Sequence, residues 1–135
     1  MPIKNHVRTV YIVDDDPSVQ RGLSRLMKSA GVAARTFGSA AGFLESDCAA
    51  SPGCLVLDVY MQGMNGPDLQ EKLKTVCPAM PVIFITAIHD ENVRAKAMEN
   101  GALAYFVKPF DGEQLLKSVR EAFDGIGKIQ ARDSV

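Results

Sequence analysis

Five short apolar runs alternate along the chain with five stretches in which apolar residues recur at helical spacing. The runs cover residues 10–13, 32–37, 54–57, 82–85 and 104–107. The first, third and fourth runs are continuous, which is typical of parallel strands buried on both faces. Because strands and helices alternate strictly, we predict an α/β fold, an open parallel sheet with helices on both faces.

The helical stretches begin and end at residues that suit these positions. Asp16 can cap the first helix, whose first turn contains Pro17, and Gly31 is expected to end it. Ser39 and Asp90 are the predicted caps of the second and fourth helices. The other predicted boundaries are Gly66-Pro67 and Pro78 around the third helix, Gly101 after the fourth, and an Asp111–Gln114 capping box before the fifth.

The chain of 135 residues has the length of one domain with its own core. The fifth helical pattern extends to Phe123, and residues 125–135 show no clear apolar period. We therefore predict one domain over residues 1–124 and a linker or frayed tail over residues 125–135. No apolar run approaches the roughly 20 residues that cross a bilayer, and residues 1–8 lack a signal-peptide core. We expect a cytoplasmic protein with no membrane partner.

Charge and cysteine content exclude several classes of function. A net charge of −1 gives no electrostatic reason for nucleic-acid binding by this segment alone. Two histidines are too few and too scattered for a metal cage. The three cysteines form no CxxC pair, which argues against a disulfide framework or a thiolate zinc site. They are Cys48, Cys54 and Cys77.

Polar residues stand where the predicted strands end. They are Asp14, Asp15 and Asp16 after the first strand, Asp58 after the third, Thr86 after the fourth and Lys108 after the fifth. The carboxyl ends of parallel strands share one edge of the sheet, and ligands bind there. Carboxylates gathered at such an edge repel one another unless a cation lies among them. Oxygen ligands suit a hard ion such as Mg²⁺, which can also offset phosphoryl charge.

Each of these residues also has a structural interpretation. Asp16 fits best as a helix cap only, and Asp14 and Asp15 taken alone could be loop residues. Lys108 alone would be a solvated strand end, and Thr86 an ordinary strand residue. The joint pattern of the five polar residues other than Asp16, at four strand ends, favours a site in which Lys108 and Thr86 contact phosphoryl oxygens.

The sequence resembles the receiver domain of bacterial two-component response regulators over residues 9–123. The matching segments are VYIVDDDPSVQRGL, CLVLDVYMQGMNG, PVIFITA and ALAYFVKPF. Their wording is most similar to the nitrogen-fixation-type subgroup, whose members usually carry a C-terminal helix-turn-helix. The resemblance implies a flavodoxin-like (βα)5 sheet with strand order 2-1-3-4-5. It also implies a phosphorylation-dependent switch that controls an output, in particular transcription, with no enzymatic activity beyond slow self-dephosphorylation.

The resemblance assigns the acidic residues. Asp58 matches the phosphoacceptor, which receives its phosphoryl group from a sensor histidine kinase. Asp15 matches the direct metal ligand and Asp14 an acidic neighbour that acts largely through water. Tyr60 matches the position that binds the metal through its backbone carbonyl. Mg²⁺ is the expected cofactor, and Mn²⁺ or Ca²⁺ can substitute for it.

The resemblance also assigns the switch. Thr86 and Lys108 match the hydroxyl and the lysine that respond to phosphorylation, and Ala87 the small residue that leaves room for the phosphoryl group. Tyr105 matches the aromatic that changes rotamer on activation. The bond between Lys108 and Pro109 is expected to be cis. The face formed by the fourth helix, fifth strand and fifth helix can form a homodimer after phosphorylation.

One position departs from the subgroup, which usually has Met-Pro-Gly-Met at residues 61–64. Here Gln62 replaces the proline, which restores a backbone N–H and loosens φ. We expect this change to affect the rigidity of the loop after Asp58 and hence phosphorylation kinetics. Tyr60 and Ile88 flank the site in the family and are expected to influence phosphate lifetime.

Three other functions fit the sequence less well. A haloacid-dehalogenase-type phosphatase needs a second acid two residues after the nucleophile, where this chain has Tyr60. A nucleotide- or flavin-binding module needs a glycine- or hydroxyl-rich phosphate loop, but the first strand is followed by Asp14, Asp15 and Asp16. A degenerate receiver that acts only in docking is disfavoured by the full set of site residues.

Overall fold

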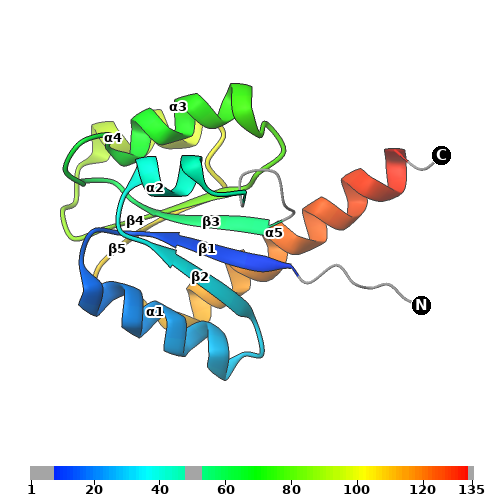
Figure 1. Ribbon diagram of the computed structural model, residues 1–135, viewed down its shortest axis with the longest axis horizontal. Coiled ribbons are helices and arrows are strands. Elements are labelled where there is room, and N and C mark those ends of the chain that lie inside the picture. The colour runs from blue at the N-terminus through cyan, green and yellow to red at the C-terminus, as the bar shows by residue number, and fades with distance from the viewer. Residues whose placement is uncertain (1–7, 48–52, 134–135) are drawn as a thin grey trace.

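The computed structural model describes residues 8–47 and 53–133. Its five strands form one parallel sheet (Figure 1). Its strands are β1 (Thr9–Val13), β2 (Ala33–Phe37), β3 (Gly53–Asp58), β4 (Val82–Thr86) and β5 (Ala104–Val107). They pair in the order β2-β1-β3-β4-β5. The predicted α/β class, the parallel sheet and the strand order are therefore confirmed.

Helices cover both faces of the sheet (Figure 1). They are α1 (Pro17–Ser29), α2 (Ala40–Glu45), α3 (Gly66–Val76), α4 (Glu91–Glu99) and α5 (Gly112–Asp133). The helices α1 and α5 pack on one face, and α2, α3 and α4 on the other. In the described part of the chain, no helix combines the length and the apolar composition that crossing a membrane requires.

The continuous apolar runs are buried on both faces because successive side chains of a strand point to opposite sides. Within β1, Val10 and Ile12 pack with α1 and α5, whereas Tyr11 and Val13 pack with α2 and α3. Every residue of β3 and β4 is buried, while the edge strand β2 is largely exposed. The sheet is thus held most firmly at its centre, where β1, β3 and β4 end beside one another.

The predicted helix caps are largely confirmed. Asp16 accepts a hydrogen bond from Ser18 N, Ser39 from Gly42 N, and Asp90 from Asn92 N and Val93 N. Gly31 and Gly101 have φ of +73° and +101°, the left-handed conformation that ends α1 and α4. The predicted start of α3 at Gly66-Pro67 is confirmed, with Asn65 as its cap. Two local details differ from the prediction. Asp111 accepts from Glu113 N rather than from Gln114 N, and Val32 lies outside β2, with its amide bound to Met27 O.

The fifth helix is longer than predicted. It was expected to end near Phe123 and to be followed by a linker or frayed tail, but α5 continues to Asp133. Gly125 and Gly127 each weaken a helix by about 1 kcal/mol, yet neither blocks its hydrogen bonds as proline does. A helix already nucleated can therefore extend through them. The domain boundary after residue 124 stays a prediction. Cys54 and Cys77 are free thiols, and Cys48 lies outside the described residues.

Candidate functional site

The polar residues predicted to converge do meet at the carboxyl edge of the sheet. Asp14 and Asp15 directly follow β1, Asp58 is the last residue of β3 and Thr86 the last of β4. Strand pairing places Asp58 beside Ile85 and Thr86 beside Val107. The N–H of Lys108 donates to the Thr86 carbonyl at 2.8 Å, and the peptide bond from Lys108 to Pro109 is cis, as expected.

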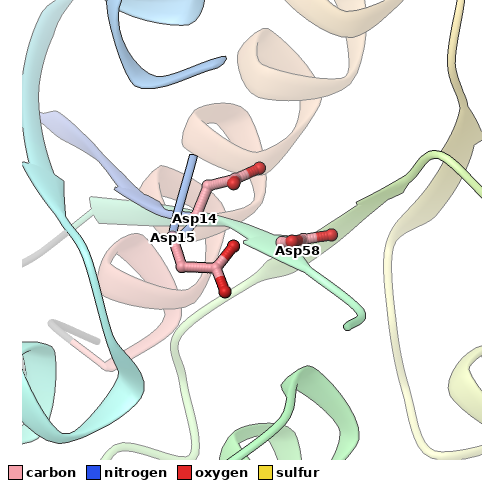
Figure 2. Close-up of side chains that lie close together, drawn as sticks. All are labelled: Asp14, Asp15 and Asp58. Carbon is pink, nitrogen blue, oxygen red and sulfur yellow. The ribbon is translucent and has the colours of Figure 1, made fainter. Parts of the chain in front are cut away.

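Three carboxylates form the centre of this edge (Figure 2). Asp14, Asp15 and Asp58 each offer one oxygen, and these oxygens lie within 4.8 Å of one another. Asp14 is 1% and Asp58 8% exposed, whereas Asp15 is exposed. We call these three residues the acidic cluster. Asp16 lies outside it, because its side chain caps α1 as predicted.

Asp14 is held firmly by backbone and side-chain contacts. Its N–H donates to Phe37 O at 3.1 Å, its carbonyl accepts from Gln20 Nε2 at 2.7 Å, and its Oδ1 accepts from Asp16 N at 2.8 Å. Its Oδ2 is buried without a hydrogen-bond partner among the described residues and lies 3.6 Å from Lys108 Nζ. The buried Oδ2 thus has capacity for another positive partner.

Burial raises the pKa of both buried carboxyl groups. For Asp58 the pKa rises from 3.8 to about 6, first because of burial and then because of the Asp14 charge, while Lys108 acts in the opposite direction. The pKa of Asp14 is also raised, again mainly by burial, with Asp16 N–H and Lys108 opposing the shift. Without a cation, ionisation of both groups near neutral pH lowers the stability of the folded protein.

Asp58→Asn is expected to raise the free energy of unfolding of metal-free protein by about 1–2 kcal/mol above about pH 6. A two-unit shift corresponds to about 3 kcal/mol, and solvent screening at this open edge leaves about half. Because the folded-state pKa is raised, the cost of ionisation is full above about pH 6 and disappears as pH falls toward 4. The gain should vanish over the same range.

Urea unfolding in excess chelator, repeated across this pH range, measures the effect. Asp47→Asn is the matched control, since Asp47 is exposed and takes part in a surface ion pair with Arg35, in which Oδ1 lies 3.7 Å from Nη1. Its effect should stay below about 0.5 kcal/mol at every pH. A gain for Asp58→Asn that does not change with pH would contradict the electrostatic explanation.

The acidic cluster fits a divalent cation. Hard ions such as Mg²⁺ prefer carboxylate and carbonyl oxygens, and the cluster supplies three carboxylates within reach of one another. Asp14 Oδ2 accepts no hydrogen bond from the described residues and lies 3.6 Å from Lys108 Nζ, while the Asp14 charge adds to the effect of burial in raising the pKa of Asp58. A bound cation would compensate that charge.

Gly66 allows α3 to approach Asp58 closely. It is buried at the first position of α3, and its N–H donates to Val59 O at 3.0 Å. A Cβ at Gly66 would collide with the Asp58 carbonyl oxygen and would lie 2.9 Å from the Phe84 ring. The absence of a side chain at residue 66 therefore sets the position of the loop that follows Asp58.

Gly66→Ala is expected to destabilise the protein by about 2–3 kcal/mol, because the added methyl group meets backbone that cannot move aside cheaply. Gly22→Ala in α1 is the matched control. A Cβ at Gly22 meets nothing within 4 Å, so alanine should stabilise by about 0.5–1 kcal/mol. Chemical denaturation of both variants measures the difference. Equal effects would show that the close approach at Gly66 is tolerated.

Thr86 is fully buried, and its hydroxyl already has partners. The Oγ1 atom donates to Ile88 O at 3.2 Å and accepts from Ile88 N at 3.1 Å. To bind a group at Asp58, the hydroxyl has to exchange at least one of these bonds. This geometry makes Thr86 a candidate for a side chain with two alternative positions.

The other predicted switch and flanking residues surround the edge. Tyr105 packs against Phe84 with ring centroids 6.1 Å apart, and its buried hydroxyl lacks a hydrogen-bond partner among the described residues. Ala87 is exposed directly after Thr86. Tyr60 and Ile88 expose 42% and 56% of their surface, so both can border an incoming group.

Sequence reasoning missed three contacts at this site. Gly66 was interpreted only as a helix start, and its glycine-proline pair gave no sign of the close approach. Gln20 was not singled out, although its side chain holds the Asp14 carbonyl. Gln62 was noted for its restored N–H, but the acceptor of that N–H was not predicted. These contacts join residues from different elements, so local patterns carried no signal for them.

Comparison with known proteins identifies relatives over most of the chain. The family model for the response regulator receiver domain matches residues 10–120. The response regulator protein TodT of Pseudomonas putida is 39% identical over 120 residues, which cover 89% of this chain and 53% of TodT. The DNA-binding transcriptional regulator NtrC of Escherichia coli is 36% identical, over 84% of this chain and 24% of NtrC. The chain thus spans about half the length of TodT and about a quarter of the length of NtrC.

Comparison with a solved structure also identifies a response regulator as similar to this chain. The structure of the response regulator StyR superposes with a TM-score of 0.85 at 41% identity, covering 94% of this chain and 65% of that one.

Proposed function

Because the chain belongs to the family of response regulator receiver domains, we propose that it is a switch phosphorylated on Asp58 by a sensor histidine kinase. The observation that carries this proposal is the acidic cluster at the sheet edge, in which Asp58 lies beside two further carboxylates. The charge of Lys108 also acts on Asp58. The three carboxylates and the nearby ammonium group of Lys108 support the proposal.

The proposed step transfers a phosphoryl group from a phosphohistidine to Asp58. A carboxylate oxygen of Asp58 attacks phosphorus, the P–N bond breaks, and its electron pair stays on the imidazole. Asp14, Asp15, Asp58 and the Tyr60 carbonyl would hold the cation, which would supply positive charge to the phosphoryl oxygens. Lys108 then contributes a further positive charge to the product.

Hydrolysis of the aspartyl phosphate is proposed to be slow, so that the protein is a switch rather than an enzyme. A phosphatase of similar chemistry uses a second acid two residues after its nucleophile, and Tyr60 occupies that position here. Tyr60 lies two residues after Asp58 and Ile88 two after Thr86, and these exposed side chains are proposed to influence the lifetime of the aspartyl phosphate.

The signal is proposed to leave the site through Thr86 and Tyr105. If the Thr86 hydroxyl leaves Ile88 for the phosphoryl group, space opens behind β4. Tyr105 is proposed to move into that space, and its buried hydroxyl, which has no hydrogen-bond partner among the described residues, supports this proposal. Ala87 leaves room for the phosphoryl group. The surface formed by α4, β5 and α5 changes shape as a consequence.

Incubation with acetyl phosphate tests the proposed function directly. The intact mass should show one phosphoryl adduct in Mg²⁺, or in Mn²⁺ or Ca²⁺ to a different extent, and none in excess chelator. Equal adduct formation in chelator would refute a cation-dependent acceptor site.

Beryllofluoride, a phosphoryl mimic, is expected to promote self-association through α4, β5 and α5. Met98 of α4 is 36% exposed, so this surface includes an apolar side chain open to solvent. Sedimentation velocity should show dimer formation in the mimic, and NMR should show a new environment for Tyr105. Asp58→Asn with beryllofluoride is the control. If saturating mimic changes neither sedimentation nor Tyr105, the signal does not take this route.

The proposed output is transcriptional, since TodT is named a response regulator and NtrC a DNA-binding transcriptional regulator. The chain itself is not proposed to bind DNA, because its net charge is −1. Its basic residues 117, 120, 128 and 132 are too sparse to follow a phosphate backbone. We place this signalling pathway in the cytoplasm, where a sensor kinase presents its phosphohistidine.

A further inference from the structure

A backbone hydrogen bond ties the loop that follows Asp58 to Asp15 of the acidic cluster. The N–H of Gln62 donates to Asp15 Oδ2 at 3.4 Å, although the two residues are 47 positions apart. Gln62 lies four residues after Asp58, and Asp15 lies in the turn between β1 and α1. The bond therefore connects the turns after the two strands that carry the cluster.

Asp15 differs from the other two members of the cluster in its surroundings. Asp14 and Asp58 are buried, so packing restricts their side chains, whereas Asp15 is exposed. Among the described residues, the N–H of Gln62 donates the hydrogen bond that the Asp15 carboxylate accepts. An exposed carboxylate without such a donor samples several rotamers, and binding a cation then costs the entropy of ordering it.

The hydrogen bond leaves room for a cation. A carboxylate has about four lone-pair sites, and the Gln62 N–H occupies one of them on Oδ2. The Oδ1 atom and the second site on Oδ2 remain available as ligands. Hydrogen bonds to metal ligands of this kind orient them, and their loss typically lowers metal affinity by about 10- to 100-fold.

We propose that the backbone N–H of Gln62 is a positioning group that holds the Asp15 carboxylate ready for a divalent cation. This inference rests on the proposed function of the acidic cluster as a cation site. Gln62 itself does not touch the cation, and its side chain has no part in the effect. Any residue except proline at position 62 can supply the donor.

Mg²⁺ titration of three proteins tests the proposal, with amide NMR shifts near Asp58 as the readout. Gln62→Pro removes the N–H, and its dissociation constant for Mg²⁺ should rise by about tenfold. Gln62→Ala keeps the N–H, and its dissociation constant should stay within twofold of the wild type. Unfolding of each variant in chelator reports whether the fold is retained.

The outcomes separate the inference from the function on which it rests. A wild-type protein that shows no saturable Mg²⁺ binding refutes the cation site itself. A wild type that binds Mg²⁺ together with a Gln62→Pro variant that binds within twofold, or more tightly, refutes only the positioning role. An equal loss in Gln62→Ala shows that the side chain acts instead, and likewise overturns the proposal.

A second measurement does not depend on the proline variant folding. Without metal, the Gln62 amide resonance of the Asp15→Asn variant should differ from that of the wild type, because the substitution removes the charged acceptor. Asp16→Asn, one residue further along and engaged in capping α1, should leave it nearly unchanged. A Gln62 amide that ignores Asp15→Asn contradicts the hydrogen bond.

Discussion

Asp58→Asn is expected to abolish the phosphoryl adduct formed with acetyl phosphate and Mg²⁺. A neutral amide at this position is a poor nucleophile, and it removes one anionic ligand from the cation. Asp14 cannot easily replace Asp58, because its Oδ1 accepts from Asp16 N and its Oδ2 lies 3.6 Å from Lys108 Nζ. Intact mass spectrometry should show the loss as complete within detection.

Asp47→Asn is the matched control, since it removes an exposed carboxylate that follows α2 and is not part of the acidic cluster. It should form the adduct as the wild type does. Peptide mapping identifies the residue modified in each protein. If Asp58→Asn retains the full adduct, or if the modified peptide lacks residue 58, the assignment of the phosphoacceptor is wrong.

Asp15→Asn is expected to weaken Mg²⁺ binding by about 100-fold. Removing one negative charge a few ångströms from a divalent ion at a partly exposed site costs about 3 kcal/mol. Asp16→Asn should change the affinity less than twofold, because Asp16 caps α1 by accepting from Ser18 N. Asparagine caps a helix about as well as aspartate, so the helix should also be retained.

The measurement is an Mg²⁺ titration of ¹⁵N-labelled protein, followed through amide shifts around Asp58. The pair of variants is matched in chemistry, since each converts one carboxylate of the same turn to an amide. Similar losses in Asp15→Asn and Asp16→Asn would show that the roles within the triplet are misassigned. Retained affinity in both would indicate that Asp14 and Asp58 suffice for the ion.

The architecture was predictable from the sequence because its determinants are local. Continuous apolar runs such as residues 82–85 are typical of strands buried on both faces, and their alternation with helical patterns favours a parallel sheet between two helical layers. Asp16, Ser39 and Asp90 cap their helices through hydrogen bonds within three residues, so each cap could be recognised by itself. Strand order came from the family resemblance and is confirmed by the pairing.

Element ends were less predictable where two structures competed for the same residues. The Val32 amide binds Met27 O in the turn after α1, which removes Val32 from β2 although its side chain suits a strand. The pattern of α5 loses its apolar period after Phe123, but the backbone remains helical to Asp133. Periodicity reports which face is buried, and a helix can continue after burial ends.

The sequence by itself determined which chemical groups reach the sheet edge, because the carboxyl ends of parallel strands lie along the same edge of the sheet. Only the tertiary structure decided how they differ. It buries Asp14 and exposes Asp15, engages the Thr86 hydroxyl with Ile88, and brings the Gln62 N–H to Asp15. These differences depend on distances between separate turns, which follow from how helices pack on the sheet. A pattern along one strand or helix contains no information about such distances.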